Sequence, residues 1–434
     1  MKKKIIIKKL ISSELNVKRF INKVIDQNTK INVKIEKEVD QILQKVKKNG
    51  DNALIYFAKK FDKCNIKKNE IKIKVSEINK FAKKCPKSIE KALNFAASRI
   101  KKFHKFQLPK NYKYSDEKGV LMGSKWIPIS SIGIYVPGGT AIYPSSILMN
   151  SIPAKIAGVE RIVMVIPQKD KNLNPILAKA AQISMVDEIF RVGGAHSIAA
   201  LAYGTKTITP VDKIVGPGNL YVTIAKKKLF GKVGIDMLAG PSEILIVADK
   251  KNNPDWIAAD LLSQAEHDIN SRAILITNDL LFGKNVLKSI NSILKILPRS
   301  KIASKSWTKN GGVIIVKNFS NVDDIINKLS PEHLELAVSH PEPILSKVAH
   351  AGAIFIGSYT PEAIGDYIAG PSHVLPTSGT AKFSSGLGVL DFMKRSSYVK
   401  MNEKSAYELN NYVSQMATIE NLEGHKLSVK IRQK

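Results

Sequence analysis

The sequence predicts an α/β protein built on parallel β-sheets. From Ile132 onward, short runs rich in β-branched residues alternate with segments of helical periodicity, a pattern typical of parallel strands joined by helices. The alternation comes in two series, interrupted at residues 239–242, which marks the expected domain boundary. A chain of 434 residues has room for two or three domains.

The elements are expected in the following order. Residues 1–118 are mainly helical, because apolar residues recur three and four positions apart; one alternating run at 70–75 could form a strand. Strands of the first series are expected at 132–136, 161–167, 188–194 and 212–216, with helices at 144–158, 173–184, 196–203 and 219–230. Strands of the second series are expected at 243–249, 272–279, 311–318, 333–338 and 352–357. After about residue 385 the pattern is helical again and ends in a short polar tail.

Composition excludes several classes of protein. The hydrophobic fraction of 44% and the charged fraction of 24% are ordinary for a globular chain, and no apolar run approaches the roughly 18 residues of a membrane span. The basic start has too short an apolar stretch for a secretory signal. Two cysteines, Cys64 and Cys85, cannot build a disulfide framework or a cysteine-based zinc site. We therefore expect a cytoplasmic protein.

The net charge of +31 raises the question of nucleic acid or an anionic membrane as a partner. The excess comes from Lys, with Arg at only 8 positions, whereas Arg is the usual reader of bases and bidentate partner of phosphate. No zinc-finger, RNA-recognition or KH motif accompanies the charge. We expect solvated lysines on helix faces, and neither a nucleic acid nor a membrane as partner.

Glycine turns follow the strands of the first series. They are Pro137-Gly138-Gly139, Gly193-Gly194 and Gly216-Pro217-Gly218-Asn219. Asn219 is a good N-cap for the next helix, and a glycine turn at a helix N-terminus offers backbone N–H groups to phosphate. The usual GxGxxG fingerprint of dinucleotide sites is absent, and tight turns alone explain these glycines equally well.

A set of histidines has polar neighbours. Gln264 and His267 lie three apart on an expected helix over 255–268, so both can ligate a cation or form an ordinary polar face. Glu332 and His333 lie where a loop enters the expected strand at 333–338, and they offer two groups for proton transfer or are neighbours by chance. Asp366 and His373 lie in a Gly- and Pro-rich loop that is functional or structural. His425 lies near the C-terminus, where most histidines are inert. Together Gln264, His267, Asp366 and His425 would suit a four-ligand Zn²⁺ site, although spacing does not show that they converge.

These residues lie in stretches that resemble histidinol dehydrogenases along nearly the whole chain. The matching stretches are IGIYVPGG (132–139), VDKIVGPGN (211–219), AGPSEILIVAD (239–249), DLLSQAEHD (260–268), SPEHLEL (330–336), GDYIAGPSHVLPTSGTA (365–381) and LEGH (422–425). The resemblance implies oxidation of L-histidinol to L-histidine through L-histidinal with two NAD⁺, the final step of histidine biosynthesis. It also implies two incomplete Rossmann-like domains, distantly similar to aldehyde dehydrogenases, and an extended C-terminal tail that crosses to the partner in a homodimer.

The resemblance also implies roles for individual residues. Gln264, His267, Asp366 and His425 match the ligands of one zinc ion per subunit, which also contacts the substrate. Ser242, Glu420 and His333 match further substrate contacts, and Glu332 and His333 match the acid/base pair. Tyr135, His196 and Asn219 match the NAD⁺ contacts, although the family usually has Gln where this chain has His196.

The implied organisation has four parts. They are a helical arm over 1–25, a zinc and substrate domain from 26–130 plus 241–385, an NAD-binding domain over 131–240, and a helical tail over 386–434 that supplies Glu420 and His425 to the other subunit. Aldehyde dehydrogenases trap the aldehyde on a cysteine, but Cys64 and Cys85 lie far in sequence from every matching stretch, so we expect no covalent thiohemiacetal. Two rival functions stay open: oxidation of another amino alcohol or a sulfonate, and a basic binding protein on an inactive dehydrogenase scaffold.

Overall fold

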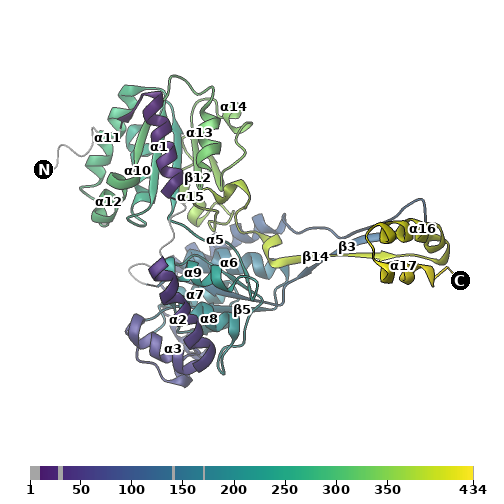
Figure 1. Ribbon diagram of the computed structural model, residues 1–434. Helices are drawn as coiled ribbons and strands as arrows, with labels where there is room; N and C mark the ends of the chain where they lie inside the picture. Colours follow the sequence, from purple (N-terminus) through teal and green to yellow (C-terminus); the bar gives the residue numbers. More distant parts are fainter. Residues whose placement is uncertain (1–9, 28–32, 139–141, 170–171, 434) are drawn as a thin grey trace.

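Two parallel sheets, each covered by helices on both faces, form the body of the protein (Figure 1). The computed structural model describes residues 10–27, 33–138, 142–169 and 172–433. The first sheet has the strand order β6-β5-β4-β7-β8. Its strands are β4 (Ser131–Tyr135), β5 (Arg161–Val165), β6 (Glu188–Phe190), β7 (Lys213–Val215) and β8 (Gly234–Ile235), joined by α6 (Pro144–Ala157), α7 (Pro175–Ile183), α8 (Gly194–Tyr203) and α9 (Leu220–Leu229). The α/β prediction is confirmed, and each helix of the first series lies where its periodicity indicated.

Alternate residues of one strand enter opposite cores, which explains why the strands read as continuous apolar runs. Val163 and Val165 of β5 pack in the core beneath α8 and α9, whereas Ile162 and Met164 pack beneath α6 and α7. The strand order reverses between β4 and β7, because the chain returns past β4 after building β6. In open α/β sheets, such a reversal creates a crevice at the carboxyl ends of the strands.

The second sheet has the order β1-β11-β10-β9-β12-β13, with all neighbours parallel. Its strands are β1 (Leu10–Ile11), β9 (Glu243–Ala248), β10 (Arg272–Thr277), β11 (Gly312–Ile315), β12 (His333–Ala337) and β13 (Ala353–Ile356). One face is covered by α10 (Pro254–Ala265), α11 (Leu280–Ile293) and α12 (Ser300–Asn310), and the other by α1 (Glu14–Gln27), α13 (Val322–Leu329) and α14 (Glu342–Leu345). The helix α15 (Glu362–Tyr367) follows β13.

The helices between residues 33 and 105 pack on the first sheet, which corrects the expected grouping of 26–130 with the second. These helices are α2 (Val33–Asn49), α3 (Asp51–Phe57), the π-helix η2 (Ala58–Asp62), η3 (Lys68–Glu70), α4 (Val75–Ala82) and α5 (Lys87–Lys105). Val39 and Leu54 share a core with α8 and α9, and Ile100 shares one with α6. An amphipathic stripe predicts that a helix is half buried but does not identify the sheet it covers. Likewise α1, which overlaps the N-terminal helical segment expected at 1–25, packs through Ile21 and Val24 on the second sheet.

A possible strand at 70–75 is not formed. Lys72 makes only an isolated antiparallel bridge with Phe190, and α4 begins at Val75. The short segment instead flanks β6, with the N–H of Ile73 donating to the carbonyl of Ile189.

The C-terminal part, together with the strands of residues 112–128 that pair with it, projects from the body as an arm (Figure 1). It consists of the antiparallel strands β2 (Tyr112–Ser115), β3 (Leu121–Pro128) and β14 (Met393–Lys400), followed by α16 (Glu403–Ile419) and α17 (Glu423–Lys430). The expected all-helical tail is thus wrong for β14. Seven of its eight residues are exposed, so they show no alternation, and pairing with β3 creates the strand. Two short 3₁₀ turns, η4 (Thr380–Lys382) and η5 (Val389–Phe392), precede it.

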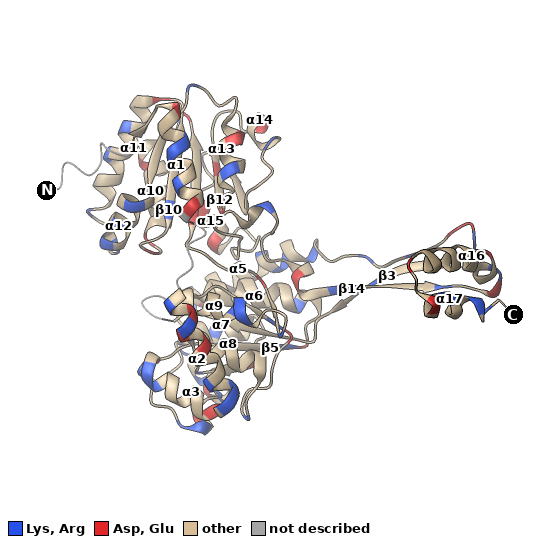
Figure 2. Cartoon of the chain, in the orientation of Figure 1, with Lys and Arg blue, Asp and Glu red and all other residues tan. Residues whose placement is uncertain are grey.

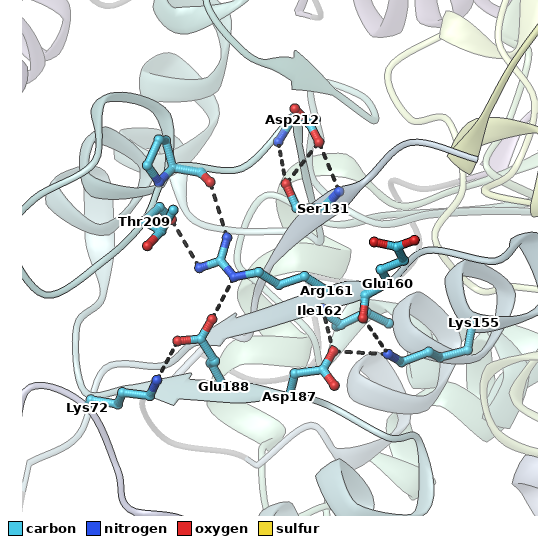
Figure 3. A network of polar contacts seen from close by, with 11 residues as sticks. Lys72, Ser131, Lys155, Glu160, Arg161, Ile162, Asp187, Glu188, Thr209 and Asp212 are labelled. Carbon is cyan, nitrogen blue, oxygen red and sulfur yellow. Dashed lines mark hydrogen bonds and ion pairs between the residues drawn. The ribbon is translucent and has the colours of Figure 1, made fainter. Parts of the chain in front are cut away.

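Polar contacts join the strands of the first sheet at their amino ends (Figure 3). The guanidinium of Arg161 donates to Glu188 at 2.6 Å and to the carbonyls of Thr209 and Pro210 at 3.1 Å. Ser131 donates to Asp212 through both its N–H and its hydroxyl, each at 2.9 Å. These contacts therefore lie at the edge of the sheet opposite the crevice.

Basic residues are distributed over the outer helices of both sheets and along the arm (Figure 2). None of the described helices combines the length and the apolar composition needed to cross a membrane.

Candidate active site

A cavity of about 150 Å³ lies where the two sheets face each other. The chain passes from β8, the last strand of the first sheet, through residues 236–242 into β9 of the second. The carboxyl edge of the first sheet therefore faces the amino edge of the second. Residues from both units line the cavity: Tyr143, Ser145, Ser146, Pro217, Asp236, Met237, Ala239, Gly240, Ser242, Gln264, His267, Glu332, His333, Asp366, Tyr367, His373, Val374, Leu375 and Thr377.

Glu332 and His333 enter this cavity from the start of β12, and both are held by the backbone of Glu243 on the neighbouring β9. The N–H of Glu243 donates to Oε2 of Glu332 at 2.8 Å, and Nδ1 of His333 donates to the carbonyl oxygen of Glu243 at 2.9 Å. A carbonyl oxygen only accepts, so Nδ1 carries the proton of the neutral ring and Nε2 carries the lone pair. An ion pair with Arg272 at 2.8 Å anchors the side chain of Glu243.

The buried environment favours the uncharged forms of both the Glu332 carboxyl and the His333 imidazole. Burial raises the pKa of the Glu332 carboxyl well above its ordinary value, and the carboxylates of Glu243, Asp366 and Glu362 add to the effect. Burial lowers the pKa of the His333 imidazole. Titratable groups with shifted pKa values that line a cavity are typical of sites of proton transfer.

Three of the four expected metal ligands line the same cavity. Gln264 is buried, and its Oε1 accepts no hydrogen bond from the residues that the structure describes. The helix α10 ends at Ala265, so His267 lies in the turn just beyond it rather than on the expected helix. Asp366 lies in α15, and burial together with the neighbouring Glu362 raises its pKa to about 8. The carboxyl of Asp366, the unsatisfied amide oxygen of Gln264 and the imidazole of His267 suit a divalent cation. The charge of the cation would stabilise the ionised form of the Asp366 carboxyl.

The sequence interpretation missed Glu362, which lies among these residues. Its Oε1 is 3.7 Å from Nε2 of His333, and its Oε2 accepts a hydrogen bond from Ser263 at 3.2 Å. Ligand atoms of His333, Glu362 and Asp366 lie within 4.8 Å of one another. One signal was available, because Glu362 precedes Asp366 by four positions and thus shares its helix face.

A second missed pair lies behind Glu362. Asp260 of α10 and Glu335 of β12 share a hydrogen bond, and burial raises the pKa of Asp260 to about 6 and that of Glu335 to about 9. Two carboxyls so close share a proton instead of ionising together. Glu335 lies two residues after His333, on the same face of the strand.

Of the other expected substrate contacts, Ser242 lines the cavity, whereas Glu420 and His425 do not. Both are exposed on the arm, at the end of α16 and in α17, and the arm carries them away from the cavity of their own chain (Figure 1). His373 does line the cavity, with Nδ1 donating to the carbonyl of Asp366 at 2.9 Å, and burial lowers its pKa to about 4.

A second cavity, of about 610 Å³, lies at the carboxyl edge of the first sheet and contains all three expected NAD⁺ contacts. Tyr135 ends β4, and its hydroxyl oxygen accepts the N–H of Gly194 at 3.4 Å; burial raises its pKa to about 12. His196 lies in the first turn of α8. Asn219 caps α9 by accepting the N–H of Val222 at 3.2 Å, as predicted for an N-cap.

The turn 216–219 borders both cavities, since Pro217 lines the first and Asn219 the second. Gly216 has φ +99°, and a Cβ there would lie 2.4 Å from the carbonyl oxygen of Tyr135, so only glycine fits. A buried ion pair holds the turn from behind. Lys226 contacts Asp236 and donates to the carbonyl of Gly216 at 3.1 Å, while Asp236 accepts the N–H of Gly216 at 2.7 Å.

Neither cysteine lines either cavity, and both are buried elsewhere. The absence of a covalent thiohemiacetal stays a prediction.

Known proteins share the sequence and the fold of this chain. The family model for histidinol dehydrogenase matches residues 25–433. The histidinol dehydrogenase of Brucella abortus (strain 2308) is 51% identical over 398 residues, covering 92% of this chain and 93% of that protein. That of Rhodospirillum rubrum is 52% identical over 395 residues, covering 91% of each. The crystal structure of histidinol dehydrogenase from Elizabethkingia anophelis aligns with a TM-score of 0.91 at 34% identity, covering 98% of this chain and 96% of that one. The chain therefore belongs to the histidinol dehydrogenase family of oxidoreductases, which catalyse the final step of histidine biosynthesis.

Proposed function

We propose that the protein converts L-histidinol, water and two NAD⁺ into L-histidine, two NADH and the released protons, with L-histidinal held between the two oxidations. One observation carries the proposal. The pair Glu332 and His333 lies in a cavity that is separated from the second, larger cavity by the turn 216–219, whose Pro217 lines the first and whose Asn219 lines the second. A substrate in the first cavity and a nicotinamide entering past that turn would be neighbours.

In the first oxidation His333 serves as the base. Its Nδ1 is committed to the carbonyl of Glu243, so Nε2 is the nitrogen that accepts the hydroxyl proton while hydride leaves the carbinol carbon. Its lowered pKa keeps the ring neutral, and therefore basic, at physiological pH. The carboxyl of Glu362, 3.7 Å from Nε2, stabilises the imidazolium that this step creates.

In the second oxidation Glu332 serves as the base toward water. Oε2 is held by the N–H of Glu243, which aims the carboxyl at the cavity. Glu332 takes a proton from the water that adds to the aldehyde carbon, and hydride then leaves the hydrate. The raised pKa makes the carboxylate a stronger base than an exposed glutamate.

Gln264, His267 and Asp366 would hold a zinc ion, with His425 of the partner subunit as the fourth ligand. When bound, this metal supplies a Lewis-acidic anchor that orients the substrate. Its ligands comprise an amide oxygen, a carboxylate and two imidazoles, a set within the range that zinc accepts in proteins.

The position of the arm supports a homodimer in which the two chains exchange their C-terminal parts. The arm presents exposed apolar side chains in Tyr407, Tyr412, Met416 and Ile419 of α16 and in Leu427 of α17. Exposed apolar surface of this extent marks a protein contact. Glu420 and His425 lie on this element, so a two-fold partner would receive them in its substrate cavity. A cytoplasmic location stays a prediction.

The stoichiometry of turnover tests the function. Purified protein with limiting L-histidinol and excess NAD⁺ should yield two NADH per histidinol consumed, with L-histidine as product. One NADH per substrate would indicate a simple alcohol dehydrogenase, and no turnover with any amino alcohol would favour a binding protein on an inactive scaffold.

A further inference from the structure

The part of the second cavity formed by η2 and α8 contains an unusual polar pair. His196 is 1% exposed, and neither of its ring nitrogens forms a hydrogen bond with any residue that the structure describes. Asp62, at the end of the π-helix η2, lies opposite, and its Oδ2 is 3.8 Å from Nε2 of His196, too far for a direct hydrogen bond. Oδ2 is also buried without a hydrogen-bond partner among the described residues. Buried polar groups are normally satisfied, so this pair is built to contact something else.

The two groups differ in what they offer. Burial lowers the pKa of His196 to about 3, so the ring is neutral at pH 7 and presents one donor and one acceptor. Burial raises the pKa of Asp62 to about 6, so its carboxyl is mainly ionised at pH 7 and only accepts. A ligand that satisfies both must place a donor against Asp62 and a second polar atom against His196.

Aromatic rings flank this pair. Phe57 and Phe61 stack with ring centroids 5.5 Å apart and an interplanar angle of 3°, and the imidazole of His196 lies 5.4 Å from Phe57 and 6.3 Å from Phe61. Phe61 lines the cavity and is 48% exposed. An exposed aromatic face beside a polar pair suits a flat heteroaromatic ring, because bases stack on such faces. The π-helix places Phe61 and Asp62 here, and π-bulges recur at functional sites.

Other residues that line the cavity carry the opposite charge to Asp62. Lys63 and Lys169 line the same cavity, and the capped N-terminus of α9 lies across it at Asn219. Phosphate groups would be favoured there, whereas the Asp62 carboxylate would repel them. The position at Asp62 is therefore suited to the base of a nucleotide rather than to its phosphates.

We propose that Asp62, His196 and Phe61 form the recognition site for the adenine ring of the dinucleotide, with Asp62 accepting the exocyclic amino group, His196 contacting a ring nitrogen and Phe61 stacking on the ring. This inference rests on the proposed use of NAD⁺ and adds the residues that select the base. Adenine presents an amino donor beside ring-nitrogen acceptors, which matches the pair. Hypoxanthine has a carbonyl oxygen in place of the amino group, and that oxygen would face the Asp62 carboxylate.

The test compares NAD⁺ with nicotinamide hypoxanthine dinucleotide in direct titrations, by calorimetry, of the intact protein at pH 7.5. The wild-type protein should bind NAD⁺ about 10-fold more tightly, the usual effect of leaving one buried polar contact unmade. Asp62→Asn should bind both within about 2-fold of each other, because an amide can turn to accept from the amino group or donate to the carbonyl oxygen. Phe61→Ala should weaken both to a similar extent and keep their ratio, since stacking does not depend on the substituent.

Asp40→Asn is the matched control. Asp40 lies on α2, pairs with Lys228 at 2.9 Å and lines neither cavity, so the control should retain the wild-type ratio. Equal binding of both dinucleotides by the wild type, or an unchanged ratio in Asp62→Asn, would overturn the adenine assignment while leaving the use of NAD⁺ intact. Binding of neither dinucleotide by the wild type would overturn the proposed use of NAD⁺, and the adenine assignment with it.

Discussion

Nδ1 of His333 lies 2.9 Å from the carbonyl oxygen of Glu243, and this contact determines which nitrogen of the ring can act as a base. The same residue of β9 holds Glu332 through its N–H. One peptide segment of a central strand thus orients both members of the acid/base pair, so the pair is as rigid as the sheet.

Replacing His333 by Asn should lower the rate of L-histidinol oxidation by at least about 100-fold, the usual loss when a general base is removed. The Asn amide can still donate to the carbonyl of Glu243, so the fold should be preserved. Steady-state NADH formation measures the loss, and the exposed His340→Asn is the control. A reduction of less than tenfold would mean that another group accepts the hydroxyl proton.

Glu332→Gln should impair oxidation of L-histidinal more than that of L-histidinol, because the amide still accepts the N–H of Glu243 but cannot accept a proton from water. The two steps are compared by supplying each substrate separately with NAD⁺, and the exposed Glu342→Gln is the control. Equal losses in both steps would assign Glu332 to binding or folding instead.

Removal of divalent metal should abolish activity, and Zn²⁺ should restore it. Acid should release the metal as well, because imidazole ligands must be neutral to bind. Gln264→Leu should lower the zinc content of the purified protein, measured by mass spectrometry, while the secondary structure remains intact. Full activity in protein shown to be free of metal would refute the ligand set.

Subunit mixing tests whether His425 acts across the dimer. His267→Ala and His425→Ala homodimers should each be nearly inactive. Random co-assembly makes about half of the dimers hybrid, and each hybrid has one intact site, so about a quarter of the wild-type activity should return. Differential tags verify that hybrids form. If His425 acted within its own chain, no activity would return.

Asp62→Asn should be more stable than the wild type at neutral pH but not in acid. The pKa of an unfolded Asp is about 3.9, whereas burial raises that of Asp62 to about 6. Folding therefore favours the protonated form, and the wild type loses stability as the pH rises from about 4 to about 6. Asn does not ionise. The free energy of unfolding of Asp62→Asn should therefore equal that of the wild type near pH 4 and exceed it by at most about 3 kcal/mol at pH 7, at about 1.4 kcal/mol per pKa unit.

Urea unfolding between pH 4.5 and 7.5 measures this difference. The exposed Asp40→Asn should instead change the free energy of unfolding by less than about 1 kcal/mol, since it removes a surface ion pair. A stabilisation of Asp62→Asn that did not vary with pH would contradict the assigned shift.

The fold was largely predictable from the sequence because its strands are buried on both faces. Runs such as residues 244–248 and 273–276 are apolar throughout, and the helices that follow the strands begin at clear caps such as Asn219 and Asn253. The arm was less predictable, since the residues of β14 are exposed and only their partner in β3 makes them a strand.

The site was predictable in its members but not in its assembly. Gln264, Glu332 and Asp366 were recognised by their chemistry and by resemblance, yet no spacing indicates that an amino edge of one sheet faces a carboxyl edge of another. Asp62 was missed because it lies among lysines in a helical segment and reads as a solvated charge. Only the π-helix and the packing against α8 turn it toward His196.

The lysines were expected to be solvated, and Lys226 is the exception, since it alone among the lysines in the described ranges is buried. Its amine forms an ion pair with Asp236 and donates a hydrogen bond to the carbonyl of Gly216. In the native protein it should therefore react more slowly with an amine-modifying reagent than any other lysine of the described ranges. Its labelling rate reports how often the turn 216–219 opens, and bound NAD⁺ should slow that rate further. The labelling rate of this one buried lysine thus measures the local opening of the segment that separates the two cavities.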